Sequence, residues 1–474
     1  MAVLGTGPGG GFQFVTIVSS DGRIATAPST RKKHIVYLSN EVPNKEYDTV
    51  LYTAFLTIRG LRDAGFDVTV MLLPHPTNSV ATPEVRQRWL DELDKLNVGV
   101  LSEPLRAATA PPKSGLSIVS RPLRKLLWPR IADHFPLISY APKIAALVET
   151  LRPDIVVYWG NFHTIAACVE IENTPFVAIV GEPPHLREWY RIRPPFVGWR
   201  IRFTLRFWRQ TILILINKRL SLRLLKKCPH VWCTVTYLSE WYRDHGIAHC
   251  QHVRNIVPDW GGADWRDRRA AAAPAERLKI VLMGALGGTS TLAGYYFLAR
   301  EILPNLDALF GGKFEIHICG NGELPPELER QFKRPGVIRR GFVDDIISEL
   351  LSCDVFLVPT PIELGSRVRI AYAWSVGCCV VSHSANAIGL EEMQNGQNAL
   401  LASSGLEVAK AIVRIDREPE LRQMLQNNGR ETFERYYSET ATVDKIITKV
   451  EDVIQSSRFA SRSDSLGKQS EVGI

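Results

Sequence analysis

Short apolar segments alternate with amphipathic ones along this chain, and the alternation starts afresh in its second half. In the first run we expect strands at 34–39, 66–73, 155–158 and 176–180, and helices at 49–64, 83–96, 144–151 and from about 164. In the second run we expect strands at 279–283, 314–319, 337–339, 355–358 and 379–382, with helices between them. Alternating strands and helices form parallel sheets that helices cover on both faces. The sequence therefore predicts an α/β fold with two Rossmann-like, doubly wound parallel-sheet domains facing a cleft.

The chain of 474 residues has room for two such domains. We place a disordered leader at 1–33, a first domain at 34–265, an alanine-rich linker at 266–278 and a second domain at 279–440. A helix at 441–455 and a disordered, serine-rich tail at 456–474 follow. The start of the chain does not resemble a secretory signal, polar residues interrupt the uncharged run 370–390, and the eight cysteines are scattered. We expect a cytoplasmic protein with reduced cysteines.

Positive charge is concentrated in two segments. Residues 189–239 contain eleven Arg or Lys and no Asp or Glu, and residues 104–132 contain six and none. The chain has a net charge of +8, so that without these two segments the remainder is net negative. This distribution predicts a local contact with an anionic surface. Nucleic acid is not the expected partner, because no recognised binding motif accompanies the charge.

Both basic segments also carry apolar anchors. In the expected helix at 199–227, Ile201, Leu205, Trp208, Ile212 and Leu215 share one face. For the centre of this helix, 212–216, we favour packing into the domain core. The segment 121–130 combines a Trp and three Leu with four cations, a composition that suits the headgroup level of an anionic membrane. The sequence thus predicts peripheral binding to the inner face of a membrane through 121–130, with 199–227 as a second candidate segment.

Glycines follow successive strands of the second half. Gly284, Gly287 and Gly288 come after the first of these strands, and Gly320 and Gly322 come after the second. Glycine lets the backbone approach a phosphate or a sugar closely enough for N–H groups to donate to it. We therefore expect these glycines to line a ligand site.

Two arginines stand after a later strand, near the start of the next helix. Arg367 and Arg369 follow a glycine turn, and a second turn contains Gly389 and Leu390. Two guanidinium groups and the positive end of a helix can hold a diphosphate and neutralise charge that develops on it. This chemistry needs no metal or other cofactor, and the pair Asp344–Asp345 is explained as a helix N-cap.

The stretch 359–377 and the following 380–390 resemble the group 1 glycosyltransferases, retaining enzymes of the GT-B fold similar to family 4. The resemblance is clear over about 275–400. It implies that the second domain binds a nucleotide sugar as substrate and that the acceptor enters between the domains. By position, Arg367 and Arg369 correspond to the diphosphate contacts, Glu363 to the acidic residue near the sugar hydroxyls, and Gly389 and Leu390 to the turn beneath the phosphates. Tyr372 occupies the position of the family's second glutamate.

In the first half, His163 and His185 follow expected strands and are candidates for orienting donor or acceptor or for accepting a proton. Glu182 and, more weakly, Glu41 are further candidates. We expect a glycosyltransferase that moves a sugar to a lipid-linked saccharide in cell-surface polysaccharide or glycolipid synthesis. Because Tyr372 stands where the family has a glutamate, an inactive homologue that acts as a scaffold or partner subunit is one alternative. A sugar-nucleotide epimerase is another.

Overall fold

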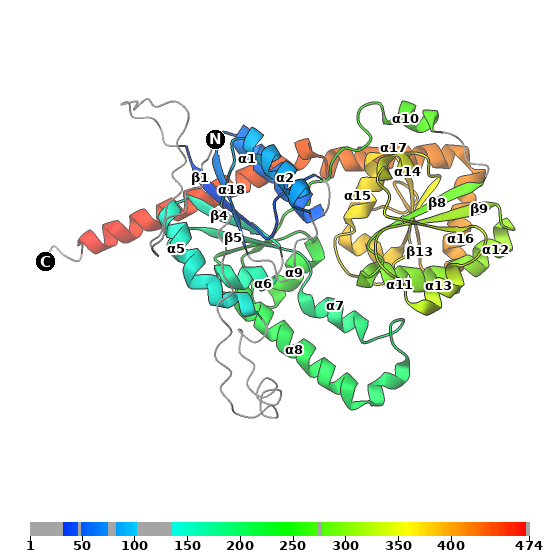
Figure 1. The fold of residues 1–474 in the computed structure, drawn as a ribbon, viewed down its shortest axis with the longest axis horizontal. Helices are drawn as coiled ribbons and strands as arrows, with labels where there is room; N and C mark the ends of the chain where they lie inside the picture. Colours follow the sequence, from blue (N-terminus) through cyan, green and yellow to red (C-terminus); the bar gives the residue numbers. More distant parts are fainter. Residues whose placement is uncertain are drawn as a thin grey trace. The chain divides into compact units, whose positions relative to one another are not determined.

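The computed structural model describes residues 32–45, 49–73, 82–101, 135–160, 162–272 and 277–470. The predicted leader, apart from its last two residues, and the basic segment 121–130 lie outside this part of the chain. Two parallel sheets, each flanked by helices, dominate the structure (Figure 1). Two Rossmann-like α/β domains were predicted, and this prediction is confirmed.

The first sheet contains seven strands in the order β3-β2-β1-β4-β5-β6-β7. Its strands are β1 (His34–Ser39), β2 (Asp67–Leu72), β3 (Gly99–Leu101), β4 (Ile155–Trp159), β5 (Phe176–Val180), β6 (His230–Cys233) and β7 (Cys250–His252). Its helices are α1 (Thr49–Asp63), α2 (Pro83–Lys95), α5 (Ala141–Leu151), α6 (Phe162–Ile165), α7 (Pro184–Arg191), α8 (Leu205–Leu225) and α9 (Thr236–Asp244). The strand order reverses between β1 and β4, which is the topology of a doubly wound sheet.

The second sheet contains six strands in the order β10-β9-β8-β11-β12-β13. They are β8 (Leu278–Met283), β9 (Phe314–Cys319), β10 (Val337–Gly341), β11 (Val355–Val358), β12 (Cys379–His383) and β13 (Leu400–Ala402). The helices are α11 (Thr289–Phe297), α12 (Leu303–Phe310), α13 (Pro326–Phe332), α14 (Ile346–Leu351), α15 (Val368–Ser375), α16 (Gly405–Arg417) and α17 (Pro419–Tyr436). A π-helical turn, Leu298–Ile302, joins α11 to α12.

Each sheet is apolar on both faces. In β4, Val156 and Tyr158 belong to one buried cluster, whereas Ile155, Val157 and Trp159 belong to another. Successive side chains of a strand point to opposite faces, so the two clusters are the cores under the two helical layers. All eight cysteines are buried and free.

The predicted linker 266–278 is partly helical. α10 (Trp265–Ala271) occupies its first half, and Arg269 donates to the carbonyl oxygens of Leu350, Val376 and Cys353 in the second domain. A buried guanidinium needs several acceptors, and these carbonyls supply them. Within the described residues, the first half of the predicted linker is therefore a helix that is fixed to the second domain.

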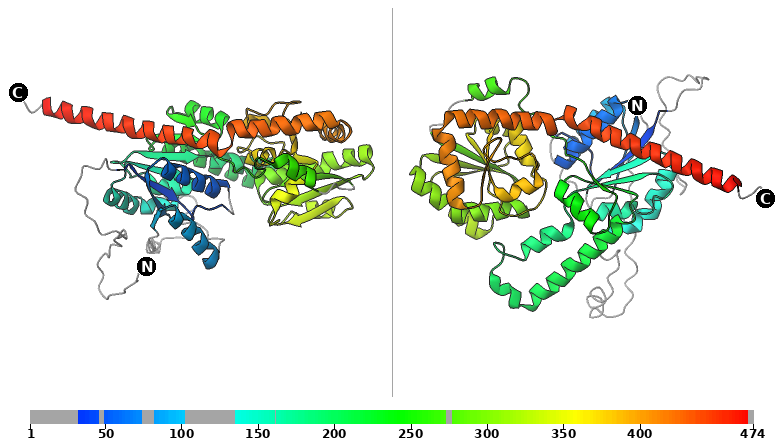
Figure 2. Two further views of the ribbon diagram at one scale, coloured as in Figure 1. Left: turned by 90° about the horizontal axis from the view of Figure 1, so that it is seen from above. Right: turned by 180° about the vertical axis from the view of Figure 1, so that it is seen from behind.

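The last helix, α18 (Glu439–Ser470), corrects the predicted disordered tail, because it continues through 456–470. Once a helix is nucleated, each added residue gains a hydrogen bond, and no proline interrupts this stretch. Val443, Ile446 and Val450 of α18 pack into the cluster that contains Phe55 and Ile58 of α1. The chain thus returns from the second domain to cover the first, and Figure 2 shows α18 continuing on from α17.

The predicted helix at 199–227 is divided. A 3₁₀ turn, η3 (Trp199–Phe203), precedes α8, and the Thr204 hydroxyl between them accepts from the Phe207 N–H at 3.2 Å. Only Ile214 of the expected buried centre is inside, while Ile212 and Leu215 are exposed. The expected core packing is therefore wrong for Ile212 and Leu215, whereas Ile216 packs against the buried cluster of the first domain. No helix of the described residues is both long and apolar enough to cross a membrane.

Candidate functional site

A pocket of about 320 Å³ lies at the carboxyl ends of β8 and β11. Met283 and Gly284 at the end of β8, Thr291 on α11, and Arg367, Arg369 and Tyr372 around the start of α15 are among its lining residues. Glu182, from the loop after β5, is another, so that both domains contribute. This is the sheet edge at which doubly wound domains bind ligands. We call it the arginine pocket.

Arg367 enters the pocket from a constrained backbone. It stands at the N-cap of α15 with φ 51°, a left-handed conformation that few non-glycine residues adopt. Its Nε donates to the Asn386 side-chain oxygen and its Nη2 to the Ile362 carbonyl. Only 6% of the residue is exposed, and burial, followed by repulsion from Arg369, lowers the pKa of its guanidinium. The surrounding residues thus hold the side chain in one orientation.

Arg369 lies two residues after Arg367, in the first turn of α15. Its Nη1 donates to the Met283 carbonyl at 2.9 Å and contacts the Thr291 hydroxyl at 3.5 Å. Burial lowers the pKa of this guanidinium too. Two buried like charges raise the free energy of the empty pocket, and an anion between them would relieve the repulsion.

Glu182 is the acidic residue among those lining the arginine pocket. Burial raises the pKa of its carboxyl group, while Arg187 and Arg367 lower it to a smaller extent. A carboxyl group with a raised pKa beside a cationic pocket can exchange a proton or bind a hydroxyl group of a ligand.

The first glycine loop lies directly against the pocket. Gly284 has φ 154°, and a Cβ there would stand 2.9 Å from both Arg369 Nη1 and the Thr291 hydroxyl. A Cβ at Gly320 would overlap the Gly284 carbonyl. Gly288 is the N-cap of α11, Gly287 has open space around it, and Gly322 faces Leu286 and Gly287. Of these five predicted residues, Gly284 lines the arginine pocket, and the others shape the loop behind it.

A cation reaches this loop from the first domain. Arg191, at the end of α7, donates from Nε to the Thr289 hydroxyl at 2.8 Å and approaches the Gly287 carbonyl at 3.5 Å. The loop itself has no basic residue between Gly284 and Thr291. Sequence reasoning missed Arg191, since nothing in the order of the residues brings α7 to this loop.

Tyr372 also lies at the arginine pocket. It is 7% exposed, lines the arginine pocket, and its ring lies 4.2 Å from that of Trp260. Gly389 packs under the Gly365 carbonyl, where a side chain would not fit. Gly389 and Leu390 line a neighbouring cavity of about 20 Å³ instead of the arginine pocket.

The predicted acid–base residues are less closely grouped. Glu363 is exposed, and its carbonyl accepts from the hydroxyls of Tyr190 and Tyr237 at 3.4 and 3.3 Å. His163 lies on α6, and its side chain is outside the described part of the structure. Neither Glu363 nor His185 is among the described residues that line the arginine pocket.

His185, on α7, is 6% exposed and its ring lies 5.4 Å from that of Trp241. Its Nδ1 is buried and has no hydrogen-bond partner among the described residues. Burial, reinforced by Lys218 and His245, lowers the pKa of His185 to about 4. The imidazole is therefore neutral at physiological pH. Glu41, the weaker candidate, accepts from Arg86 Nε at 3.2 Å.

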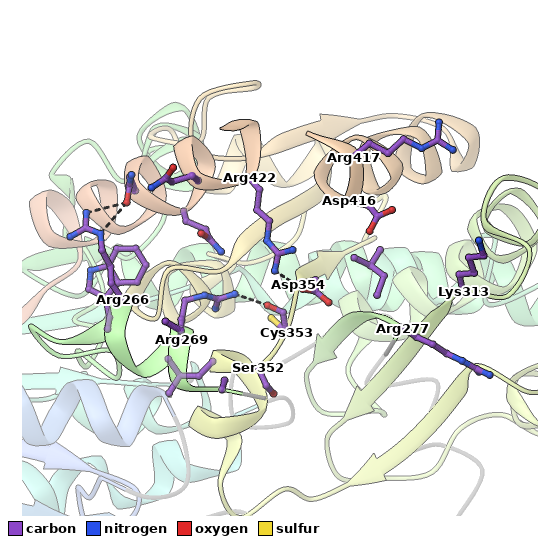
Figure 3. Close-up of a pocket in the computed structure, with 18 of the residues that line it drawn as sticks. Arg266, Arg269, Arg277, Lys313, Ser352, Cys353, Asp354, Asp416, Arg417 and Arg422 are labelled. Carbon is purple, nitrogen blue, oxygen red and sulfur yellow. Dashed lines mark hydrogen bonds and ion pairs between the residues drawn. The ribbon is translucent and has the colours of Figure 1, made fainter. Parts of the chain in front are cut away.

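A larger cavity, of about 910 Å³, lies at the opposite edge of the second sheet (Figure 3). Arg269 donates to the Cys353 carbonyl and Arg422 to Asp354, as Figure 3 shows. Leu278 and Asp354, at the amino ends of β8 and β11, line it. These arginines are engaged in holding α10 and α17, and we do not assign the donor site to this cavity.

Within the described residues, no group of three or more His, Cys, Asp or Glu side chains could hold a metal ion. Asp345 is the N-cap of α14, since its carboxylate accepts from the Ser348 N–H at 2.9 Å.

One known protein family matches part of the chain. Residues 277–417 match the family model "Glycosyl transferases group 1". No curated protein matches the chain. Sucrose-phosphate synthase from Thermosynechococcus elongatus has a similar structure, with a TM-score of 0.61, 14% identity, and coverage of 90% of this chain and 100% of that one.

Two further solved structures share the fold. Anabaena Alr3699/HepE in complex with UDP and glucose has a TM-score of 0.58 and 14% identity, covering 88% of this chain and 99% of that one. WaaG, a glycosyltransferase involved in lipopolysaccharide biosynthesis, has a TM-score of 0.53 and 12% identity, covering 87% and 98%. Residues 277–417 are therefore a group 1 glycosyl transferase domain, and the chain as a whole has the GT-B fold of these solved structures.

Proposed function

We propose that this enzyme moves a sugar from a nucleotide sugar to a lipid-linked saccharide, with retention of configuration, at the inner face of a membrane. The product would belong to a cell-surface polysaccharide or glycolipid. The observation that carries the proposal is the pair of buried guanidinium groups, Arg367 and Arg369, in one pocket at a sheet edge.

In this proposal the donor's diphosphate occupies the arginine pocket. Arg367 and Arg369 donate to phosphate oxygens, and the start of α15 adds the positive end of a helix. When the bond between the anomeric carbon and the phosphate oxygen breaks, negative charge develops on the leaving diphosphate, and the guanidinium groups stabilise it. The Thr291 hydroxyl contacts Arg369 and keeps it directed at the same point.

The acceptor hydroxyl must lose a proton as its oxygen forms the new bond to the anomeric carbon. We propose that the proton passes to an oxygen of the departing phosphate, so that nucleoside diphosphate and the new glycoside are the only products. Glu182 lines the pocket with a raised carboxyl pKa and is our choice for holding a sugar hydroxyl during this step. Glu363, His163 and His185 remain candidates for orienting the substrates.

The comparisons support the choice of substrates. The Anabaena structure contains UDP and glucose, which makes uridine diphosphate sugars the first donors to test. WaaG acts in lipopolysaccharide biosynthesis, and a lipid-linked acceptor is consistent with the basic segments of this chain.

The test is product analysis with purified protein, a panel of nucleotide sugars and lipid-linked saccharides. We expect glycoside of retained anomeric configuration together with nucleoside diphosphate, and loss of both in Arg369→Ala. Arg330→Ala, at an exposed arginine of α13, is the matched control and should behave like the wild type. A rearranged nucleotide sugar without acceptor consumption would identify an epimerase, and no turnover of any donor would favour the inactive scaffold.

A further inference from the structure

A helical arm made of η3 and α8 exposes large apolar side chains. The exposed fractions are 79% for Phe203, 89% for Leu205, 58% for Trp208 and 55% for Leu215. Of the eleven large apolar residues that are exposed in the described part of the chain, five fall within 203–215. Such a concentration is uncommon on a protein surface that only meets water.

These side chains lie on one face of the helix. Leu205, Trp208, Ile212 and Leu215 are separated by steps of three and four residues, so they form a continuous stripe. Leu220 and Leu224 are buried in the core of the first domain and fix α8 to it by another face. Figure 1 shows the first half of α8 and the adjoining turn projecting beyond the sheet of the first domain, and the rear view in Figure 2 agrees.

Arginines stand beside the stripe. Arg202, Arg206 and Arg209 are exposed, and none forms an ion pair with another described residue. The whole segment 189–239 lacks Asp and Glu. An apolar stripe with adjacent cations suits a surface whose outer layer is anionic and whose next layer is hydrocarbon.

We propose that this face of η3 and α8 is a membrane-docking surface that lies in the headgroup region of an anionic bilayer. Phe203, Leu205 and Trp208 would enter the boundary of the acyl chains, while Arg206 and Arg209 would contact lipid phosphates. A second copy of the chain fits the charge poorly, because a symmetric contact through this face would bring like charges together. The inference extends the proposed function, since a lipid-linked acceptor would be presented at the same surface.

The experiment is co-sedimentation of the full chain with vesicles of phosphatidylcholine alone or with added phosphatidylglycerol. We expect binding to the anionic vesicles only. Arg206→Gln with Arg209→Gln should weaken partitioning by about 30-fold, because each cation near an anionic surface contributes about a factor of five. Arg330→Gln with Lys333→Gln, at exposed positions of the second domain, is the charge-matched control.

A second pair of variants tests the apolar stripe. Leu205→Ser with Trp208→Ser should reduce vesicle binding at least tenfold, whereas Leu406→Ser with Met424→Ser, at exposed apolar residues of the second domain, should not. Unchanged binding in both α8 variants would overturn the proposal and direct attention to another surface. Absence of wild-type binding would overturn it, and so would a dimer in light scattering that dissociates in Leu205→Ser with Trp208→Ser.

UDP binding is measured on the same preparations. A wild-type chain that binds UDP but no vesicle refutes the docking surface alone. A chain that binds anionic vesicles but no nucleotide sugar or nucleoside diphosphate refutes the proposed transfer and leaves the docking surface in place.

Discussion

His185 shows how burial determines the response of a single residue to pH. Its ring is packed against Trp241, and Lys218 and His245 approach it from α8 and α9. Its pKa in the folded protein is about 4, below the ordinary value of 6.5. The unfolded chain therefore binds a proton at a higher pH than the folded chain does, so that the stabilising contribution is complete above pH 6.5 and is lost as the pH falls toward 4.

We predict that His185→Phe reduces the loss of stability between pH 7 and pH 4.5. Between pH 6.5 and pH 4, protonation of His185 should lower the free energy of unfolding of the wild type by up to about 3 kcal/mol. The reason is that the pKa of His185 in the folded protein, about 4, lies below its ordinary value of 6.5. Urea unfolding at several pH values measures the slope. His249→Phe, at an exposed histidine, controls for the added ring. An equally steep slope in His185→Phe would show that the imidazole does not titrate as its burial implies.

Single residues show how much of the pocket's lining could be predicted from the sequence. Arg367, Arg369 and Gly284 were predicted because they follow strands, whose carboxyl ends meet at one edge, and Tyr372 because of the family resemblance; the structure brings these four residues to one pocket, and their roles stay predictions. Arg191 could not be found in this way, since its contact with the Thr289 hydroxyl depends on how the chain beyond β5 folds back.

At the scale of elements, the structure places a helix of the first domain against the glycine loop that follows β8 in the second domain. The contact between Arg191 and Thr289 joins α7 to the start of α11. The loop has no basic residue between Gly284 and Thr291, so that Arg191 is the cation that contacts it from the first domain. We propose that Arg191 assists donor binding from this position.

We predict that Arg191→Ala raises the donor KM by about 5- to 30-fold, which corresponds to about 1 to 2 kcal/mol for a hydrogen bond from a charged group, with a smaller effect on kcat. Arg191→Lys should restore part of the affinity. Steady-state kinetics with a uridine diphosphate sugar measures both constants, and Arg193→Ala, at an exposed arginine just after α7, serves as control. Equal KM values in the two alanine variants would remove Arg191 from the donor site.

Periodicity predicted most of the longer strands and helices, but it missed β3, β6, β7 and β13. These strands have three or four residues, too few for an alternating pattern to stand out. A different limit explains why the sequence predicted core packing for the whole of 212–216, although Ile212 and Leu215 are exposed. A stripe of apolar residues shows that one face of a helix avoids water, but it does not show whether protein or another partner covers that face.

At the scale of the whole molecule, α18, which follows the second domain in sequence, packs against α1 of the first domain. Ile446, Val450 and Ile454 are buried against α1, and Glu439 forms an ion pair with Arg59. The stability of the first domain therefore depends on residues that follow the second domain in sequence.

We predict that Ile446→Ala lowers the free energy of unfolding by about 2 to 5 kcal/mol, because it leaves a cavity between α18 and α1. Ile388→Ala, at a residue that is 39% exposed, should change it by less than about 0.5 kcal/mol. Denaturant unfolding followed by circular dichroism measures the free energy of unfolding of each variant. Similar stabilities for the two variants would mean that α18 does not hold the first domain.

The measurement that tests the central claim most directly is calorimetric titration of UDP into the wild type, Arg367→Ala and Arg369→Ala. Arg422→Ala, in the cavity at the opposite edge of the sheet, is the control. We predict that UDP binds the wild type and Arg422→Ala alike, and that each arginine-pocket variant loses at least about 30-fold in affinity, or about 2 kcal/mol. Undiminished binding in Arg367→Ala and Arg369→Ala would contradict the assignment of the diphosphate to the arginine pocket.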